Sequence, residues 1–439
     1  MTQILCVLTL NILSALLVHG GQQCNTICNL PEDTLCYDPK LEIVHLYEDQ
    51  WPTDIAITPC GRKFSCYPSG IDAKNTNNGC NGKYAVAELK KCGEVPYPNY
   101  CINNPPNGAI NYCTSPPVTY GYPDYFLSVQ ALLYDCAYGL FCLDAARARD
   151  DKQIIYEASK GGTKVVLVDT CSDCVVRTYC FPVDVAKPTS YFINMAVDNV
   201  KGVMYIADAP GYSIVALDLC TGKSFIAFQG DPTLMWIQGG LDWIWGQPSY
   251  STGTILNCDG KESNCEIQIG SIPFGVSTLS LSCDRKRLYY SQLGGRTLWS
   301  VDTKALLVAD GVADTIVNHG EKGVTLGLIT DEQGLIWSGN AENDAIVYYN
   351  PCCAFAKTYL YIRDPRLSWV HGFSEAGDGY MYCLANYING INLVYPGTGP
   401  IYADRRKKPY VLFRYKLPCD CLCPNFCTEP TLGKQVSCG

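Results

Sequence analysis

The stretch Asn194-Met-Ala-Val-Asp-Asn-Val-Lys-Gly-Val-Met-Tyr-Ile-Ala-Asp208 contains two short apolar runs on either side of a turn that holds Gly202. Residues that favour strands flank a glycine that tolerates a positive φ, which is the pattern of a β-hairpin. Residues Ser213–Asp218 add a third apolar run before a Thr221-Gly222 turn. The stretch therefore predicts one antiparallel sheet built from consecutive strands.

The same unit recurs five more times along the chain, at Asp54–Cys66, Ala131–Asp144, Thr278–Tyr290, Gly327–Trp337 and Gly372–Tyr382. Further strands follow several copies, at Lys164–Asp169, Val175–Tyr179, Thr297–Asp302 and Ala345–Tyr349. One such sheet cannot bury its own apolar face, so the array must close into a ring. Six units of about four strands predict an all-β fold, a six-bladed β-propeller. A β-sandwich with a second domain does not account for six copies.

The composition agrees with this fold and excludes one class of partner. The chain has 439 residues, and its 39 Gly, 26 Pro and 31 Tyr favour many short strands and tight turns over long helices. There are 33 basic and 42 acidic residues, a net charge of −9. We expect no nucleic-acid partner, because that balance provides no positive surface for phosphate.

The two ends of the chain differ in character from the repeats. Residues 1–20 predict a secretory signal peptide, because Ile4–Val18 is apolar, uncharged and shorter than a membrane span. No later apolar run is long enough to cross a bilayer, so we expect a secreted, extracellular protein with no membrane partner. Residues 21–45 form an N-terminal cysteine-containing segment, 46–418 the propeller, and 419–439 a cysteine-rich C-terminal tail.

Two insertion loops are expected within the propeller, at residues 69–123 and 247–266. Of the 27 cysteines, 26 remain after Cys6 is removed with the signal, and an even number in an oxidising compartment favours disulfides. We therefore expect disulfide-rich insertions and a disulfide-rich tail. Candidate pairs within single hairpins are Cys60 with Cys66, Cys136 with Cys142, and Cys171 with Cys174.

A candidate ligand site follows from the ends of the predicted strands. Propellers usually bind ligands at one mouth of the central channel, where the inner strands begin. The polar residues at these positions are Asp54, Gln130, Asn194, Thr325, His371 and, after the next strand of the sixth copy, Asn386. The alternative is that these side chains cap strand ends and satisfy backbone amides. We predict no catalytic residue, metal site or cofactor, since no G-x-S-x-G or H-E-x-x-H motif is present.

Several of these segments resemble the major royal jelly protein and yellow family. They are Ser190–Asp198, Met204–Asp208, Leu217–Ser224, Leu288–Val301 and Gly327–Trp337. The resemblance extends from about Leu41 to Pro418, although this chain has more cysteine than typical members and no N-glycosylation sequon. It implies a secreted six-bladed propeller from a family whose roles include amine binding, pigmentation chemistry and nutrition.

The resemblance leaves several functions open. We expect binding of a small polar or aromatic-amine ligand, a biogenic amine or catechol-like molecule, at the channel mouth. In amine-binding members the last blade supplies a Thr, an Asn and an aromatic residue, where this chain has Gly372, Asn386 and Ile388. Alternatives are a dopachrome-converting isomerase with His371 or Asp54 as proton-transfer group, and a structural or storage protein. A calcium-dependent lactonase is least favoured, because Leu326 stands where an Asp ligand is needed.

Overall fold

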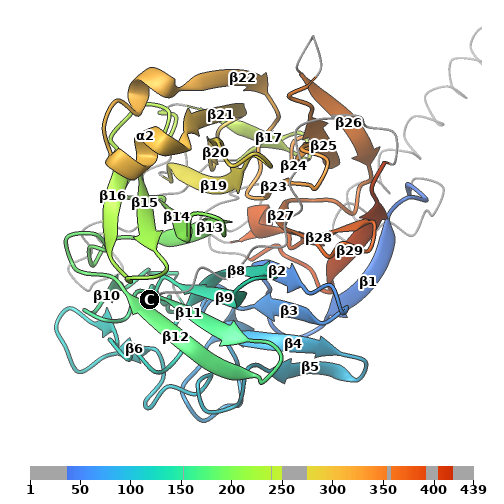
Figure 1. The fold of residues 1–439 in the computed structure, drawn as a ribbon. Coiled ribbons are helices and arrows are strands. Elements are labelled where there is room, and N and C mark those ends of the chain that lie inside the picture. Colours follow the sequence, from blue (N-terminus) through green and yellow to red (C-terminus); the bar gives the residue numbers. More distant parts are fainter. Residues whose placement is uncertain are drawn as a thin grey trace, which may run out of the picture.

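The computed structural model describes residues 37–151, 153–238, 240–249, 274–352, 357–391 and 404–418. The predicted signal peptide, the cysteine-rich tail and most of the predicted loop 247–266 lie outside these residues. Six four-stranded antiparallel sheets surround a common centre (Figure 1). The prediction of an all-β, six-bladed propeller is confirmed.

Each blade runs from an inner strand at the centre to an outer strand at the rim. Blade one consists of β2 (Asp54–Ile57), β3 (Lys63–Cys66), β4 (Val86–Lys90) and β5 (Gly93–Pro96), and blade two of β8 (Val129–Asp135), β9 (Gly139–Asp144), β11 (Lys164–Asp169) and β12 (Cys174–Cys180). Blade three consists of β13 (Phe192–Asp198), β14 (Val203–Asp208), β15 (Ser213–Asp218) and β16 (Ser224–Gln229), and blade four of β19 (Val276–Leu281), β20 (Arg287–Gln292), β21 (Thr297–Asp302) and β22 (Val317–Glu321). Blade five consists of β23 (Leu328–Thr330), β24 (Ile336–Asn340), β25 (Ala345–Tyr349) and β26 (Thr358–Arg363), and blade six of β27 (Val370–Glu375), β28 (Tyr380–Ala385), β29 (Tyr410–Lys416) and β1 (Glu42–Tyr47). The six repeats found in the sequence are the inner hairpins of these blades.

The ring is closed, because each inner strand contacts the inner strands of both neighbouring blades, including β27 with β2. The apolar faces of the blades are buried against one another. Phe141 and Leu143 of blade two share one buried cluster with Met204 and Ile206 of blade three. A single blade therefore completes its core only by packing on its neighbours, as the repeat argument requires.

Blade six is completed by the N-terminal strand. β1 pairs antiparallel with β29, with Glu42 opposite Arg414 and Tyr47 opposite Tyr410. β1 begins within the segment 21–45 and belongs to the sheet of blade six. Residues from the two ends of the chain thus share one sheet, which ties the ring shut.

The remaining elements lie between or beside the blades. Residues 69–123 contain β4 and β5 of blade one, as well as β6 (Ile110–Asn111) and β7 (Val118–Thr119), which form a small sheet with β10 (Glu157–Ala158). A separate hairpin consists of β17 (Asp242–Ile244) and β18 (Gln247–Ser249). The helical turns are α2 (Thr303–Val308), η2 (Ala73–Asn75), η4 (Ala313–Thr315) and η5 (Ile388–Gly390). Among the described residues no helix is long and apolar enough to cross a membrane.

The predicted disulfides within single hairpins are wrong. Cys66 lies opposite Asp54 in the ladder, at the open end of the β2–β3 hairpin, whereas Cys60 lies in the turn of this hairpin. Cys60 and Cys66 are both free thiols. The strand between the two cysteines separates their Cα atoms by more than ~10 Å, whereas a disulfide allows at most ~7 Å between Cα atoms. The other predicted pairs are also free, as are the cysteines of the predicted insertion, Cys80, Cys92, Cys101 and Cys113. Three cysteines of the described residues, Cys220, Cys283 and Cys352, are disulfide-bonded.

Candidate functional site

A cavity of about 260 Å³ lies among the six inner strands and is called the channel below. The apolar side chains in its wall include Leu132, Leu279 and Phe373. The side chains with polar atoms in the wall are those of Asp54, Tyr134, Asn194, Ser280, Thr330, His371, Ser374 and Glu375. No lysine or arginine lines it. This volume suits a small ligand, since pockets for drug-sized molecules begin near ~300 Å³.

Asp54 lies at the start of β2, at the end of the channel that we call the upper mouth. Its Oδ1 accepts a hydrogen bond from the Ile55 amide at 2.9 Å, and its Oδ2 accepts one from the Leu132 amide at 3.0 Å. Leu132 belongs to β8, so this carboxylate joins blades one and two. Burial raises the pKa of Asp54 to about 7, in spite of the two amides that favour the ionised form.

The same kind of bond joins other pairs of blades. Asn194 Oδ1 accepts a hydrogen bond from the Leu279 amide at 3.1 Å, which links blades three and four. The Ser374 hydroxyl accepts one from the Ile57 amide at 2.9 Å, across the closing interface between blades six and one. Such bonds satisfy buried backbone donors, as the capping interpretation of these residues predicts. Asp54 and Asn194 therefore hold the wall together as well as lining it.

His371 also lines the upper mouth, and Asn386 lies behind it. Asn386 Nδ2 lies 3.0 Å from His371 Nδ1, and the Thr53 hydroxyl is within 3.4 Å of the ring. Burial lowers the pKa of His371 to about 3, so the imidazole is neutral at physiological pH. Asn386 Nδ2 also donates to the Pro52 carbonyl at 3.1 Å. Asn386 is fully buried, does not line the channel, and connects blade six to the segment before β2.

Two more of the predicted residues, Gln130 and Thr325, lie near the upper mouth but do not line the channel. Gln130 bonds to Ser128, two residues before it, and sits at a β-bulge between Val129 and Ala131. The Thr325 hydroxyl donates to the Gly327 carbonyl at 3.1 Å and accepts from the Gly327 amide at 3.0 Å. Both side chains therefore stabilise local backbone.

The structure adds a residue that sequence reasoning missed. Glu375 ends β27 at the opposite, lower mouth and lines the channel. The Glu332 amide donates to its Oε2 at 3.2 Å. Burial first, and then the nearby carboxylates of Asp331 and Glu332, raise the pKa of Glu375 to about 8. Examining the ends of the inner strands as well as their starts would have identified it.

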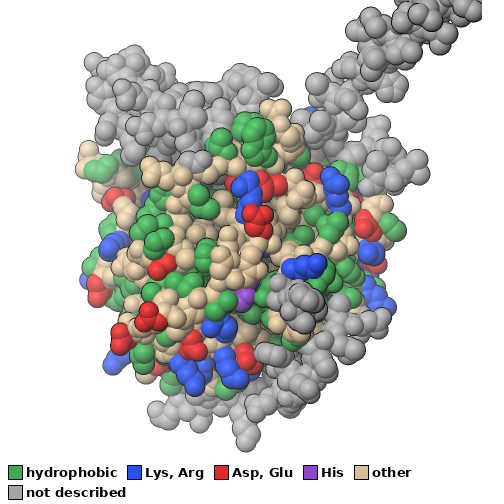
Figure 2. Space-filling view, turned by 90° about the horizontal axis from the view of Figure 1, so that it is seen from above, with side chains coloured by type: hydrophobic (Ala, Val, Ile, Leu, Met, Phe, Trp, Pro, Cys, Tyr) green, Lys and Arg blue, Asp and Glu red, His purple; other side chains and the backbone are tan. Residues whose placement is uncertain are grey.

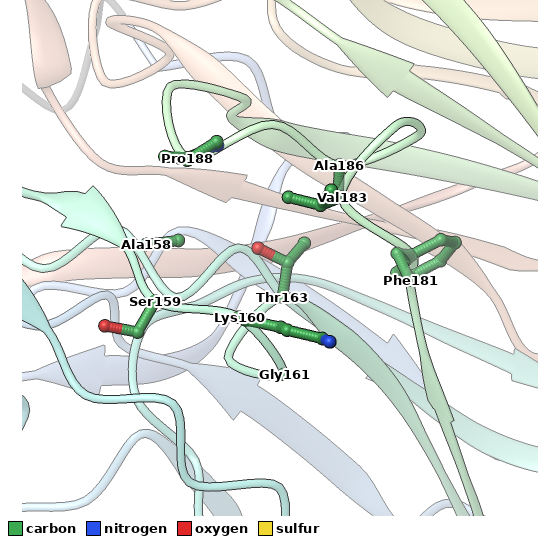
Figure 3. A pocket seen from close by; sticks show the side chains of 9 residues that line it. All are labelled: Ala158, Ser159, Lys160, Gly161, Thr163, Phe181, Val183, Ala186 and Pro188. Carbon is green, nitrogen blue, oxygen red and sulfur yellow. The ribbon is translucent and has the colours of Figure 1, made fainter.

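Two other cavities lie outside the channel. One of about 400 Å³ lies between the outer parts of blades four and five, where Arg296 pairs with Glu342 and burial lowers the pKa of Lys322 to about 7. The other, shown in Figure 3, has about 20 Å³ between Thr163, Phe181 and Val183, which is room for about one water. On the face shown in Figure 2, acidic and basic side chains are interspersed. Within the described ranges no group of His, Cys, Asp and Glu residues is arranged to hold a metal ion.

The family resemblance is confirmed for part of the chain. The family model described as "Major royal jelly protein" matches residues 153–229, which span the outer half of blade two and all of blade three. Three of the segments that carry the resemblance, Ser190–Asp198, Met204–Asp208 and Leu217–Ser224, lie within this range. The comparison with curated proteins gives no match.

Solved structures with a similar arrangement have very different sequences. One is a catalytically inactive virginiamycin B lyase from Staphylococcus aureus with quinupristin, at 11% identity over 86% of this chain and 99% of that chain, with a TM-score of 0.42. Another is the calcium-binding protein regucalcin from Agrobacterium tumefaciens, at 11% identity over 85% and 93%, with a TM-score of 0.43. A luciferin-regenerating enzyme matches at 10% identity over 87% and 96%, with a TM-score of 0.43. These similarities carry no argument about activity.

Proposed function

We propose that this propeller binds a small aromatic amine in its channel. The observation that carries the proposal is the charge of the wall: Asp54 and Glu375 line one cavity, His371 is neutral, and no lysine or arginine is present. Burial raises the pKa of both carboxyl groups, and an ammonium ion next to one of them favours its ionised form. The ligand and the wall can then form a buried ion pair, in which each charge compensates the other for the water that it loses. The ligand supplies the positive charge that the wall lacks.

The apolar part of the wall fits the rest of such a ligand. Tyr134 and Phe373 line the channel together with aliphatic side chains of the inner strands. An aromatic ring buries its apolar area against them, and an ammonium near a ring gains cation–π attraction. The wall therefore offers a small molecule one carboxyl group at each mouth, as well as apolar and aromatic side chains.

Isothermal titration calorimetry of the purified chain with dopamine, serotonin, histamine and catechol tests this proposal. We expect heat with at least one amine and none with catechol, which has the ring without the ammonium group. The Glu375→Gln variant should weaken amine binding about tenfold or more, which is ~1.4 kcal/mol. Glu321→Gln removes an equal charge at the cavity between blades four and five and serves as the matched control. Equal binding of catechol, or no heat with any amine, would contradict the proposal.

A proton-transferring isomerase of the dopachrome type is the second candidate. It is favoured by the position of Glu375 in the channel wall, where burial raises the pKa of its carboxyl group to about 8, because a general base works best when its pKa lies near the working pH. The test is the rate of dopachrome loss, followed by absorbance, with the wild type and the Glu375→Gln and His371→Asn variants. A rate equal to that in buffer eliminates the isomerase. If amine binding is absent as well, the structural or storage role is left.

We also propose that the protein is secreted. The family that matches residues 153–229 and the apolar run at 4–18 support this. Expression of the full chain in a secretory host, followed by N-terminal sequencing of the medium, should give a start close to residue 21. Retention of the whole chain inside the cell would contradict it.

A further inference from the structure

Three turns at the lower rim carry a cysteine at the same place. Each turn follows the third strand of its blade, and the cysteine amide donates to the side-chain oxygen of the residue two positions earlier. The pairs are Cys171 with Asp169 at 2.9 Å, Cys220 with Asp218 at 2.8 Å, and Cys352 with Asn350 at 2.9 Å. Cys220 and Cys352 are disulfide-bonded, whereas Cys171 is an exposed free thiol. Cys171 thus occupies the same place in its turn as two disulfide-bonded cysteines, but it is itself not bonded.

Two of the turns between the inner and second strands also contain a cysteine, although not at the same place in the turn. The Gly61 amide donates to the Thr58 carbonyl at 2.9 Å, and the Arg285 amide donates to the Ser282 carbonyl at 2.8 Å. The turn of blade one contains Cys60 and the turn of blade four contains Cys283. Cys283 is disulfide-bonded, and Cys60 is an exposed free thiol.

The turns that hold Cys60 and Cys171 touch each other across the interface between blades one and two. The guanidinium of Arg62 donates to the Thr170 carbonyl and, at 2.9 Å, to Asp173 Oδ1. Thr170 directly precedes Cys171, and Arg62 is two residues after Cys60. Burial, and then the neighbouring thiols of Cys136, Cys60 and Cys171, raises the pKa of Tyr134. The guanidinium of Arg62 therefore joins the two turns that hold Cys60 and Cys171.

We propose that Cys60 and Cys171 form a disulfide between blades one and two when the protein meets a small disulfide oxidant such as glutathione disulfide. The Cys60 thiolate attacks one sulfur of the oxidant and releases a first glutathione thiolate. The Cys171 thiolate then attacks the Cys60 sulfur and releases the second. Two protein thiols lose two electrons and two protons, and one glutathione disulfide becomes two glutathiones.

The local chemistry suits Cys60 for the first attack. Its sulfur is 3.1 Å from the Thr58 hydroxyl, which lowers the pKa of the thiol, and the Arg62 amide and guanidinium act in the same direction. The resulting bond would fasten two blades at the lower rim, next to Tyr134 in the channel wall. It is independent of the proposed amine ligand.

Peptide mapping of the full chain tests the proposal. The protein is equilibrated in glutathione buffers of rising oxidised fraction, quenched in acid, alkylated with N-ethylmaleimide and digested with trypsin. Cys60 is the only cysteine in the peptide 41–62, and Cys171 shares the peptide 165–177 with Cys174. We expect these two peptides to become linked. Cys60→Ser and Cys171→Ser should abolish the link, and Cys174→Ser, a matched control in the same turn, should keep it.

Fragmentation of the linked wild-type peptides shows which of Cys171 and Cys174 carries N-ethylmaleimide, so the wild-type map decides the question even if a variant fails to fold. Cys171 joined to Cys174 within one peptide, or Cys60 joined to Cys136, would overturn the assignment. Alkylation of both Cys60 and Cys171 at every glutathione ratio would overturn it as well.

Discussion

The indole nitrogen of Trp51 donates a hydrogen bond of 2.7 Å to the carbonyl oxygen of Asn386, a residue 335 positions further along the chain. Both residues are fully buried. Trp51 precedes the inner strand of the first blade and Asn386 follows the second strand of the last one. This bond crosses the interface where the ring closes, so it secures the ends of a repeat array against each other.

Replacing Trp51 tests this closing bond. Trp51→Phe retains most of the apolar volume but leaves the Asn386 carbonyl without its donor, so we expect a loss of about 1–3 kcal/mol in the free energy of unfolding. Chemical denaturation followed by circular dichroism measures it. Trp243→Phe, at a side chain on β17 that is 54% exposed, is the control and should cost under about 0.5 kcal/mol. Equal effects of the two changes would mean that the bond is not important.

The ion pair between Lys164 and Asp144 makes a second prediction. The two groups are 3.0 Å apart and fully buried in blade two. Lys164→Met leaves a buried carboxylate without its counter-charge, so we expect a loss of about 3–5 kcal/mol. Lys90→Met, which removes a half-exposed partner of Glu88, should cost no more than about 1 kcal/mol in the same thermal or chemical unfolding measurement. Similar losses for both lysines would refute this account.

Gly372 lies where the carboxylate of Asp54 leaves no room for a side chain. A Cβ atom at this position would lie 2.3 Å from Asp54 Oδ1. We therefore expect Gly372→Ala to lose about 1–3 kcal/mol through overpacking. In a double-mutant cycle, Asp54→Ala should make the added methyl group less costly. If the two changes are additive, the carboxylate is not what excludes a side chain.

The pKa of Glu375 makes stability depend on pH. It rises from the ordinary value of 4.5 to about 8 in the folded state, so between these values the folded chain holds a proton that the unfolded chain has lost. The contribution of Glu375 to the free energy of unfolding is therefore fully present below pH 4.5 and is lost as the pH rises toward 8. Glu375→Gln should be more stable than the wild type by at least about 1 kcal/mol at pH 9 and equal to it at pH 4. A difference that does not change between pH 4 and pH 9 would show that the raised pKa is wrong.

The sequence predicts the blades well because their signals are local. Alternating apolar residues and a glycine turn define each inner hairpin, and all six appear as strands at the predicted positions. The pairing of β1 with β29 was not predicted, because it joins residues more than 360 positions apart with no local pattern. The free thiols were not predicted either, since an even number of cysteines does not say which of them lie within bonding distance.

The candidate site was harder to predict than the fold. β-Bulges interrupt the strands β8, β13, β19 and β27 near their starts, at the upper mouth. Counting alternate residues back from the turns therefore does not predict which side chains face the channel there. Asp54, Asn194 and His371 do line the channel, whereas Gln130, Thr325 and Asn386 bond to nearby backbone instead. Glu375 was missed because only residues at the upper mouth were considered, whereas Glu375 lies at the end of β27, at the lower mouth.

The pairing of β1 with β29 also has a consequence for synthesis on the ribosome. β1 is among the first strands to emerge, and its partner β29 is among the last. At ordinary elongation rates, β1 of the nascent chain is without its partner strand for on the order of tens of seconds. The torus therefore cannot close before β29 has been synthesised, and until then the hydrogen-bonding edge of β1 lacks its partner.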